Sequence, residues 1–326
     1  MRLETTPAGL FLPEVGLHVD PVLPVEAAIV THGHGDHARA LPGRMYATPE
    51  TAAIVRARFG ETATVVLPYG EPVDVGSPRS PARLTLFSAG HVLGSAGALV
   101  EQGGERLFVT GDVKLRPSLT CATAEIPECD TLVVESTFGL RVFRFPETRL
   151  LREAIVAEAR AALGEGATPV FLAYALGKGP EVARILGGAG IPVSLHGAIE
   201  KMSSLYRAFG VTFPNAVPYD SSALEGRALV VPPPCRSQPM VTKIRNRRVV
   251  AVTGWALLDA AYDRYGAQGL VPMSDHADFD ELVAIVEKSR ARRVRTVHGF
   301  ADAFARILAR RGMDAEALEA AAPEEA

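Results

Sequence analysis

Short apolar runs, separated by glycine and proline, recur through the first 140 residues. Each run is rich in β-branched or aromatic residues and ends at a turn former, which is typical of a strand. The pattern predicts strands at Ala27–Thr31, Arg83–Ser88, Ala98–Glu101, Leu107–Thr110 and Thr131–Glu135. We therefore expect a β-rich first part of the chain.

The spacing of the apolar residues changes near residue 146. In Glu147–Leu163 they recur every three or four residues, which predicts an amphipathic helix. A strand at Thr168–Ala173 and a helix from Glu181 are expected next, and strands and helices alternate up to about Gly254. This alternation is typical of a parallel α/β layer.

The last part of the chain returns to a mixed pattern. It predicts a helix at Phe279–Ser289, a strand at Arg293–Val297 and a helix near Asp302–Arg311, and the Ala/Glu-rich tail Ala315–Ala326 is expected to fray. We expect three parts along the chain: a first part at 1–145, an α/β insert at 146–265 and a C-terminal part at 266–326.

Composition and charge narrow the class of protein. Of the 326 residues, 48% are hydrophobic and 22% are charged, which excludes a disordered or fibrous chain. No apolar run approaches the roughly 18 residues that span a bilayer, and the N-terminus is acidic where a signal peptide is basic, so we expect a cytoplasmic protein. The net charge of −3 means that any nucleic-acid binding must come from a local patch.

The most informative segment is THGHGDHA, Thr31–Ala38, directly after a predicted strand. His32, His34, Asp36 and His37 would each need a partner in a packed core, whereas imidazole and carboxylate are natural ligands of a divalent metal. If the strand continues, His32 and His34 share a face, while Asp36 and His37, beyond Gly35, face another point. The segment therefore favours two neighbouring metal ions.

Two further candidate ligands follow predicted strands. His91 lies in the glycine-rich turn SAGHVLGSAG, and Asp112 lies in TGDV. Alone, each is equally well explained as a turn residue. Together with the first cluster, they add a third imidazole and a carboxylate able to bridge two cations.

These motifs resemble those of a known family. H-x-H-x-D-H, GHVLGSA and TGD resemble the metallo-β-lactamase fold hydrolases, and ESTFG with Glu135, SDHAD with His276 and TVHGF with His298 resemble the additional motifs of the β-CASP nucleases. The resemblance covers most of the chain. With LPYGEP and AYALGK included, the sequence is similar to bacterial ligase-associated DNA exonucleases. This resemblance implies an α/β protein with a metallo-β-lactamase αββα sandwich and an inserted α/β β-CASP domain.

The resemblance also implies a set of site residues. One metal would be held by His32, His34 and His91, a second by Asp36, His37 and His298, and Asp112 would bridge them. Asp20, in HVDP, would orient ligands, although a turn-forming role is as compatible with the sequence. Glu135 and His276 would support proton transfer and, with Asp36, form the catalytic set. The ligand types suit Zn²⁺ or Mn²⁺.

The implied function is a metal-dependent DNA exonuclease in DNA repair, in which two metal ions activate a water for phosphodiester hydrolysis. A functional association with a DNA ligase and a helicase is expected. Three alternatives stay open: an RNA nuclease of the same branch, a small-molecule metallo-hydrolase, and a scaffold with a vestigial site. The insert and the ESTFG and SDHAD motifs argue against the second, and the complete ligand set against the third.

Several residues are candidate phosphate contacts. Lys178 lies in GKGP at a predicted helix start, which can hold a phosphate, and Ser274 lies beside His276. The basic run TKIRNRR can contact a nucleic-acid backbone through Lys243, Arg245, Arg247 and Arg248, as can Lys288–Arg295. Ordinary turn formation and a solvated charged surface are the competing explanations.

Overall fold

The structure is a computed structural model that describes residues 1–76 and 80–318. It divides into two compact units. The first contains Met1–Arg116, Cys121–Phe143 and the chain from His276 onward, and the second contains Pro117–Thr120 and Arg144–Asp275. The second unit is therefore an insertion. The domain borders expected from the change in sequence pattern, at 145 and 265, stay a prediction.

The first unit begins with a mostly parallel sheet. Within the described residues its six strands stand in chain order: β1 (Glu4–Thr6), β2 (Gly9–Leu12), β3 (Leu17–Val19), β4 (Ala27–Ile29), β5 (Arg44–Ala47) and β6 (Ala63–Val66). The strands β3 to β6 pair in parallel, so their carboxyl ends meet at one edge. Of these strands, the sequence pattern locates β4.

A second sheet of the same unit joins segments from both ends of the chain. Among the described residues its order is β19-β18-β11-β10-β9-β8-β7, with β7 (Val73–Asp74), β8 (Ala82–Ser88), β9 (Ala96–Gln102), β10 (Glu105–Val109), β11 (Thr131–Glu135), β18 (Arg293–Val297) and β19 (Asp314–Ala317). The strands β10, β11, β18 and β19 run parallel to one another. The strands expected from the sequence in this sheet are confirmed, with shifts of up to two residues at their ends.

The expected fraying of the C-terminal tail is wrong for its first residues. Asp314–Ala317 forms β19, in register with Arg293–Thr296 of β18, because an extended segment can complete the edge of a parallel sheet despite its polar composition. Residues 319–326 of the predicted tail lie outside the described residues.

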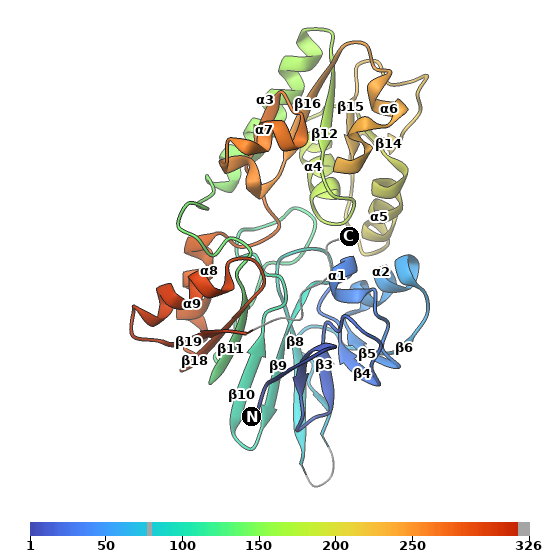
Figure 1. The fold of residues 1–326 in the computed structure, drawn as a ribbon. Coiled ribbons are helices and arrows are strands. Elements are labelled where there is room, and N and C mark those ends of the chain that lie inside the picture. The colour runs from blue at the N-terminus through green and yellow to red at the C-terminus, as the bar shows by residue number, and fades with distance from the viewer. Residues whose placement is uncertain (77–79, 319–326) are drawn as a thin grey trace. The chain divides into compact units, whose positions relative to one another are not determined.

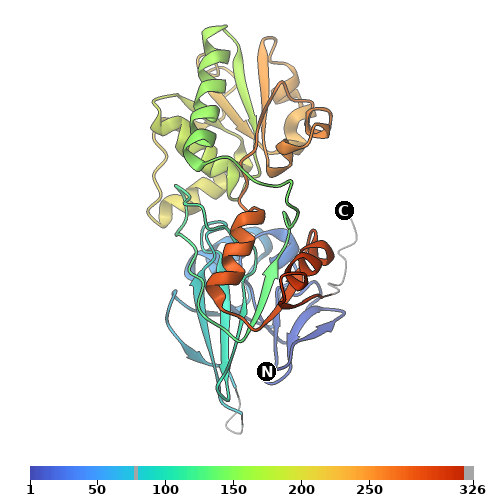
Figure 2. The same cartoon turned by 90° about the vertical axis from the view of Figure 1, so that its left-hand side faces the viewer.

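The two sheets pack face to face and carry helices on their outer faces. Leu12 and Ile29 of one sheet share an apolar core with Leu86, Val109 and Val133 of the other. The helices α1 (Gly35–Ala38) and α2 (Pro49–Phe59) lie against the first sheet, and α8 (Phe279–Ser289) and α9 (Ala301–Ala309) lie against the second (Figures 1 and 2). This arrangement is the predicted αββα sandwich.

The second unit is built on a parallel sheet whose strands are nearly all apolar and buried, as expected for a sheet covered on both faces. Within the described chain the order is β14-β13-β15-β12-β16-β17, with β12 (Thr168–Leu172), β13 (Val193–Leu195), β14 (Ala216–Pro218), β15 (Ala228–Val231), β16 (Arg247–Val252) and β17 (Gly269–Val271). The helical elements are α3 (Thr148–Gly164), α4 (Lys178–Gly188), α5 (Gly197–Ala208), η1 (Pro233–Ser237), α6 (Pro239–Thr242), η2 (Gly254–Leu257) and α7 (Ala260–Tyr265). The inserted α/β unit is therefore confirmed.

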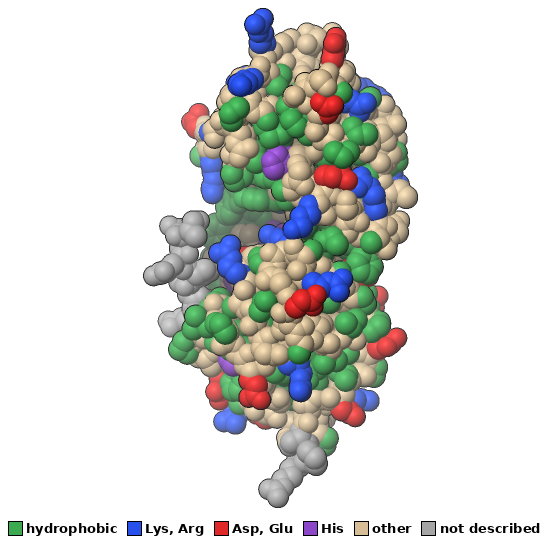
Figure 3. Space-filling view, turned by 90° about the vertical axis from the view of Figure 1, so that its right-hand side faces the viewer, with side chains coloured by type: hydrophobic (Ala, Val, Ile, Leu, Met, Phe, Trp, Pro, Cys, Tyr) green, Lys and Arg blue, Asp and Glu red, His purple; other side chains and the backbone are tan. Residues whose placement is uncertain are grey.

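Two surface properties bear on function. No helix in residues 1–76 or 80–318 combines the length and the apolar composition needed to cross a membrane. On the face shown in Figure 3, Lys and Arg side chains are interspersed with Asp and Glu on both units. The face in this view is therefore not uniformly basic.

Candidate metal centre

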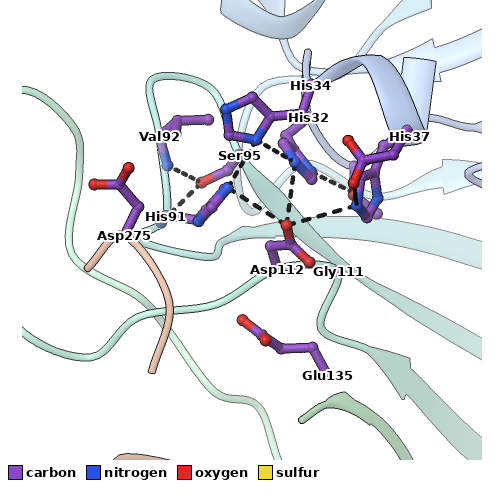
Figure 4. Close-up of polar contacts among 12 residues, drawn as sticks. His32, His34, His37, His91, Val92, Ser95, Gly111, Asp112, Glu135 and Asp275 are labelled. Carbon is purple, nitrogen blue, oxygen red and sulfur yellow. Dashed lines mark hydrogen bonds and ion pairs between the residues drawn. The ribbon is translucent and has the colours of Figure 1, made fainter. Parts of the chain in front are cut away.

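Most candidate ligands of the first unit follow the ends of strands, whereas Asp36 and His37 lie in the short helix α1. Asp20 follows β3, His32 and His34 follow β4, His91 follows β8, Asp112 follows β10 and His298 follows β18. Since the two sheets bring these strand ends to one edge, the side chains gather there although they are up to 278 positions apart in numbering. Figure 4 shows His32, His34, His37 and His91 around Asp112.

The tightest cluster contains three imidazoles and one carboxylate. His34 Nδ1 lies 3.0 Å from His32 Nε2 and 3.1 Å from His91 Nε2, and Asp112 Oδ2 lies 3.4 Å from His32 Nε2 and 3.5 Å from His91 Nε2. A tetrahedral zinc site with typical bond lengths has ligand–ligand edges of about 3.4 Å. The four donor atoms therefore fit one divalent cation, and this fit rests on their own spacing.

A second group of donors lies on the other side of Asp112. His37 Nε2 lies 3.5 Å from Asp112 Oδ2 and 3.6 Å from Asp36 Oδ2. The His298 ring is more exposed, with its centroid 5.6 Å from that of His37. Asp112 thus faces both groups with one oxygen. Asp36 and His298 stand at the solvent side and are less tightly grouped than the ligand atoms of the first cluster.

Asp20 holds His37 from behind. Its Oδ2 lies 2.8 Å from His37 Nδ1, and its carboxylate also accepts the Thr31 backbone N–H at 2.7 Å and the Thr31 hydroxyl at 2.5 Å. With Nδ1 bound to a carboxylate, Nε2 is the nitrogen directed at Asp36 and Asp112. Asp20 adopts a left-handed φ of 46°, a conformation that costs on the order of 1 kcal/mol or more outside glycine, and these three contacts maintain it.

The pKa values of the groups in the cluster are shifted in different directions. Burial would lower the pKa of His37, but the carboxylates of Asp112 and Asp20 outweigh it and raise the pKa to about 10. Burial lowers the pKa of His32 well below its ordinary value, and the neighbouring imidazoles add to the effect. Burial raises the pKa of Asp112. His37 thus carries a proton among three carboxylates, where a divalent cation would replace it.

Glu135 and His276 form a separate pair beside the cluster. His276 Nδ1 lies 2.9 Å from Glu135 Oε1, and the fully buried Glu135 also accepts the backbone N–H groups of Val113 at 3.0 Å and Thr137 at 3.1 Å. Burial alone would raise the pKa of Glu135, but its contacts with His276 lower it. Because these donors occupy the carboxylate, Glu135 is suited to orient His276 rather than to bind a metal.

A small cavity lies beside the second group of donors. Its volume is ≈ 90 Å³, and its lining includes Asp36, His37 and His298 together with the apolar Val19 and Val297. That volume holds several water molecules. Water can therefore lie beside these candidate ligands in a cavity that also has apolar lining residues.

Sequence reasoning missed the residues that hold these ligands. Thr31 binds Asp20, Ser95 Oγ accepts the backbone N–H of His91 at 3.1 Å, and the Ser136 hydroxyl donates to the carbonyl of His298 at 3.1 Å. Each lies within a motif that the sequence already singles out. Short hydroxyl side chains next to candidate ligands are the signal that could have found them.

The candidate phosphate contacts Lys178 and Ser274 lie at the carboxyl end of the second unit's sheet. Lys178 is buried, its Nζ lies 3.3 Å from Asp275 Oδ2, and it stands 5.2 Å from the centroid of the Tyr174 ring. Ser274 is buried as well. Lys178 begins α4, three residues before the predicted start, because Gly177 forms the turn with a φ of 87°. Its ammonium is engaged within the unit.

The TKIRNRR segment lies at the opposite edge of that sheet. It leads into the amino end of β16, whereas the chain leaves the unit through Asp275, after β17. Arg247 donates to the carbonyls of Thr242 and Ile244, and Arg248 Nε lies 2.7 Å from Glu158 Oε2. Lys243 and Arg245 are exposed. The phosphate-binding role of this segment stays a prediction.

Comparisons with known proteins agree with the fold. Residues 10–141 match the model of the beta-lactamase superfamily domain. Over 312 residues, 95% of this chain, the sequence is 34% identical to a probable DNA ligase of Opitutus terrae. It is also 24% identical, over 57% of the chain, to an RNase J-like protein of Methanocaldococcus jannaschii. The chain is a β-CASP member of the metallo-β-lactamase superfamily.

Two further facts show how far the β-CASP relationship extends. The chain matches 30% of the length of the Opitutus protein and 50% of the Methanocaldococcus protein, so it spans half or less of either relative. A crystal structure of a protein of unknown function from Enterococcus faecalis V583 covers 83% of this β-CASP chain, and the chain covers 75% of that protein, with a TM-score of 0.59 and 13% identity. That likeness supports the fold alone. The metallo-β-lactamase family uses divalent metals, in agreement with the His/Asp clusters.

Proposed function

We propose that this protein is a metal-dependent DNA exonuclease that hydrolyses phosphodiester bonds in DNA repair. The observation that supports the proposal is that the His32, His34, His91 and Asp112 donors lie at one edge of the first unit beside the His276–Glu135 pair. A small-molecule hydrolase would need the donors but neither the pair nor the inserted unit.

In this proposal His32, His34 and His91 would hold one divalent ion, and Asp36, His37 and His298 would hold a second. Asp112 would be shared between them, as the 3.4–3.5 Å distances of its Oδ2 to three imidazoles support. Zn²⁺ or Mn²⁺ bound there would supply Lewis-acid activation of a water and charge neutralisation at the phosphate. Asp20 orients His37 through its hydrogen bond to Nδ1.

The role of His276 follows from its hydrogen bond. With Nδ1 donating to Glu135, the His276 ring is held in place and its Nε2 is the nitrogen left to carry the transferred proton. His276 donates that proton to the departing ribose oxygen, and a well-placed acid of this kind contributes about two to four orders of magnitude in rate. Glu135 keeps the ring in place, and Asp36 belongs to the same catalytic set.

DNA is favoured as the substrate by the extent of the similarity. The match to the protein named as a probable DNA ligase covers 95% of the chain, while the match to the RNase J-like protein covers 57%. The first relative also joins a region like this chain to further sequence in one polypeptide, which supports a functional association with a DNA ligase. An association with a helicase and a cytoplasmic location are parts of the proposal that rest on the family resemblance.

The proposal is tested by digestion of end-labelled DNA and RNA of one sequence, with Zn²⁺ and Mn²⁺ in turn. Stepwise loss of nucleotides from DNA ends supports it, and faster digestion of RNA would favour the second candidate, an RNA nuclease. Replacing His276 by alanine should lower turnover about a hundredfold or more while the metal content stays that of the wild type. Unchanged turnover would exclude His276 as the acid.

A further inference from the structure

The loop after β10 carries Asp112 and, four residues later, Arg116. Arg116 contacts the first turn of α8 with both its backbone and its side chain. Its backbone N–H donates to Glu281 Oε1 at 2.5 Å, its Nε donates to Glu281 Oε2 at 3.0 Å, and its Nη2 lies 3.1 Å from Asp278 Oδ2 and also contacts Glu281. This one arginine therefore fixes the loop to the start of α8.

The same loop meets the His276 turn at a second point. The backbone N–H of Ala277 donates to the carbonyl of Val113 at 2.6 Å, and the Val113 N–H donates to Glu135 Oε1, the atom that also faces His276 Nδ1. The turn that carries His276 is thus attached to the Asp112 loop on both sides of Ala277. Arg116 forms the attachment on the α8 side.

The helix does not need Arg116 in order to begin. Asp278 Oδ1 accepts the Glu281 backbone N–H at 2.9 Å, and Glu281 Oε2 accepts the Asp278 backbone N–H at 3.2 Å. These two bonds form a capping box, which stabilises a helix start by itself. Loss of Arg116 should therefore loosen the loop from the helix without unfolding α8.

We propose that Arg116 is a positioning residue, which holds the His276 imidazole at its working distance from Asp112. The inference rests on the proposed nuclease function. Arg116 acts through Asp278 and Glu281 on the turn that carries His276, two residues before Asp278. The Arg116 side chain is 19% exposed and its partners are 8% and 13% exposed, so water screens the ion pairs only in part.

A substrate whose leaving group needs no proton distinguishes a positioning role of Arg116 from a general structural role. In the Arg116→Met variant, turnover of end-labelled DNA should fall about tenfold to a hundredfold, as expected for a displaced catalytic group. Turnover of bis(p-nitrophenyl) phosphate should stay within about twofold, because nitrophenolate leaves without protonation. Arg116→Lys should recover part of the DNA activity.

Two controls make the comparison specific. Arg207 makes a similar two-point contact with Glu200 on α5, and Arg207→Met should change neither activity. In a His276→Ala background, Arg116→Met should cause no further loss of DNA activity, since coupled residues are not additive. An equal loss on both substrates, or full additivity with His276→Ala, would overturn the proposal.

A measurement independent of activity keeps the inference separate from the proposed function. Long-range ¹H–¹⁵N spectra of the histidines should show one hydrogen-bonded Nδ1–H that is lost in His276→Ala. This signal should shift or broaden in Arg116→Met and stay unchanged in Arg207→Met. If the wild type cleaves neither DNA nor the nitrophenyl ester, the nuclease proposal fails. An unchanged His276 signal in Arg116→Met overturns the role of Arg116 in either case.

Discussion

Both units end their parallel strands at an edge that carries polar side chains, but the two edges differ in how their charges are balanced. In the first unit, three imidazole nitrogens and a carboxylate converge within 3.0–3.5 Å. In the second, the Lys178 ammonium pairs with Asp275 at 3.3 Å and lies over the Tyr174 ring. At the first edge, metal-binding donor atoms converge on one point. At the second edge, the charge of Lys178 is balanced by that of Asp275.

This difference shows which edge needs an added cation. Burial disfavours a protonated His32, and repulsion from the neighbouring imidazoles adds to this effect, so the pKa of His32 lies well below its ordinary value. A divalent ion removes the repulsion and satisfies the acceptors together. A buried ion pair such as Lys178–Asp275 needs no ligand. Chemistry is therefore expected at the first edge, and a structural role for charge at the second.

The largest effect is expected from removal of the cation or of its shared ligand. Chelation by EDTA should abolish nuclease activity, and Zn²⁺ or Mn²⁺ should restore it. Asp112→Asn should lower turnover by more than about a hundredfold, since loss of an outer-shell partner alone costs 10–100-fold. Metal content and turnover are measured together, with the exposed Asp302→Asn as control. Retention of both metals and full activity by Asp112→Asn would remove Asp112 from the site.

A smaller effect is expected from Asp20. Asp20→Asn removes the charged acceptor of His37 Nδ1–H and should weaken metal binding about 10–100-fold. Asp130→Asn, which alters another carboxylate that accepts a backbone N–H, is the matched control. Calorimetric titration with Zn²⁺ measures both. Equal affinities would show that Asp20 merely forms its turn.

The raised pKa of His37 predicts the pH dependence of metal binding. Because the pKa is about 10 in the cation-free protein, His37 is protonated throughout the neutral range and a cation must displace that proton. The affinity should therefore rise with pH, by about tenfold per unit for one proton released, and level off above the pKa. Titrations at several pH values in buffers of different ionisation heat count the protons. A pH-independent affinity would contradict the charge assigned to His37.

At the second edge, Lys178→Met should affect stability more than DNA binding. It leaves the buried Asp275 carboxylate without its cation, which costs about 3–5 kcal/mol, and the added Asp275→Asn change should restore part of the loss. Urea unfolding measures this, with the exposed Lys201→Met as control. Two results together would instead identify Lys178 as a phosphate contact. The Lys178→Met variant would unfold at the same urea midpoint as the wild type, and the slope of log K against log salt for DNA binding would fall by about one unit.

The smallest effect is expected at TKIRNRR. Lys243→Gln with Arg245→Gln changes two exposed cations at the amino ends of the strands, away from the residue that leads into His276. The slope of log K against log salt for DNA should change by less than about one unit. A reduction of about two units would establish the phosphate contacts that the sequence suggests.

Much of the first edge is predictable because its residues lie in short motifs at strand ends. THGHGDHA, TGD and ESTFG each follow an apolar run, and an apolar run that ends in polar residues marks where a strand stops. The strands β1, β2 and β3 are harder to locate, since they are only three or four residues long. The start of α4 is obscured by Gly177 and Gly179, which weaken any helical pattern.

Contacts between distant segments are not predictable from one sequence. Arg116 and Glu281 are 165 positions apart, and Lys178 and Asp275 are 97 apart. The local sequence around each residue gives no indication of the residue that it contacts. The sequence therefore suggests Lys178 as a phosphate ligand, and only the structure shows its ion pair with Asp275. The sequence gives no indication of a role for Arg116.

The pairing of β11 with β18 has a consequence for synthesis on the ribosome. Thr131–Glu135 pairs in register with Arg293–Val297, and the main segment of the second unit, Arg144–Asp275, is translated between them. Until residue 297 emerges, β11 is an apolar strand with one open edge, which is a site for mispairing with other chains. The nascent protein must keep that edge covered during the translation of about 160 residues, a delay of roughly ten seconds or more at ordinary elongation rates.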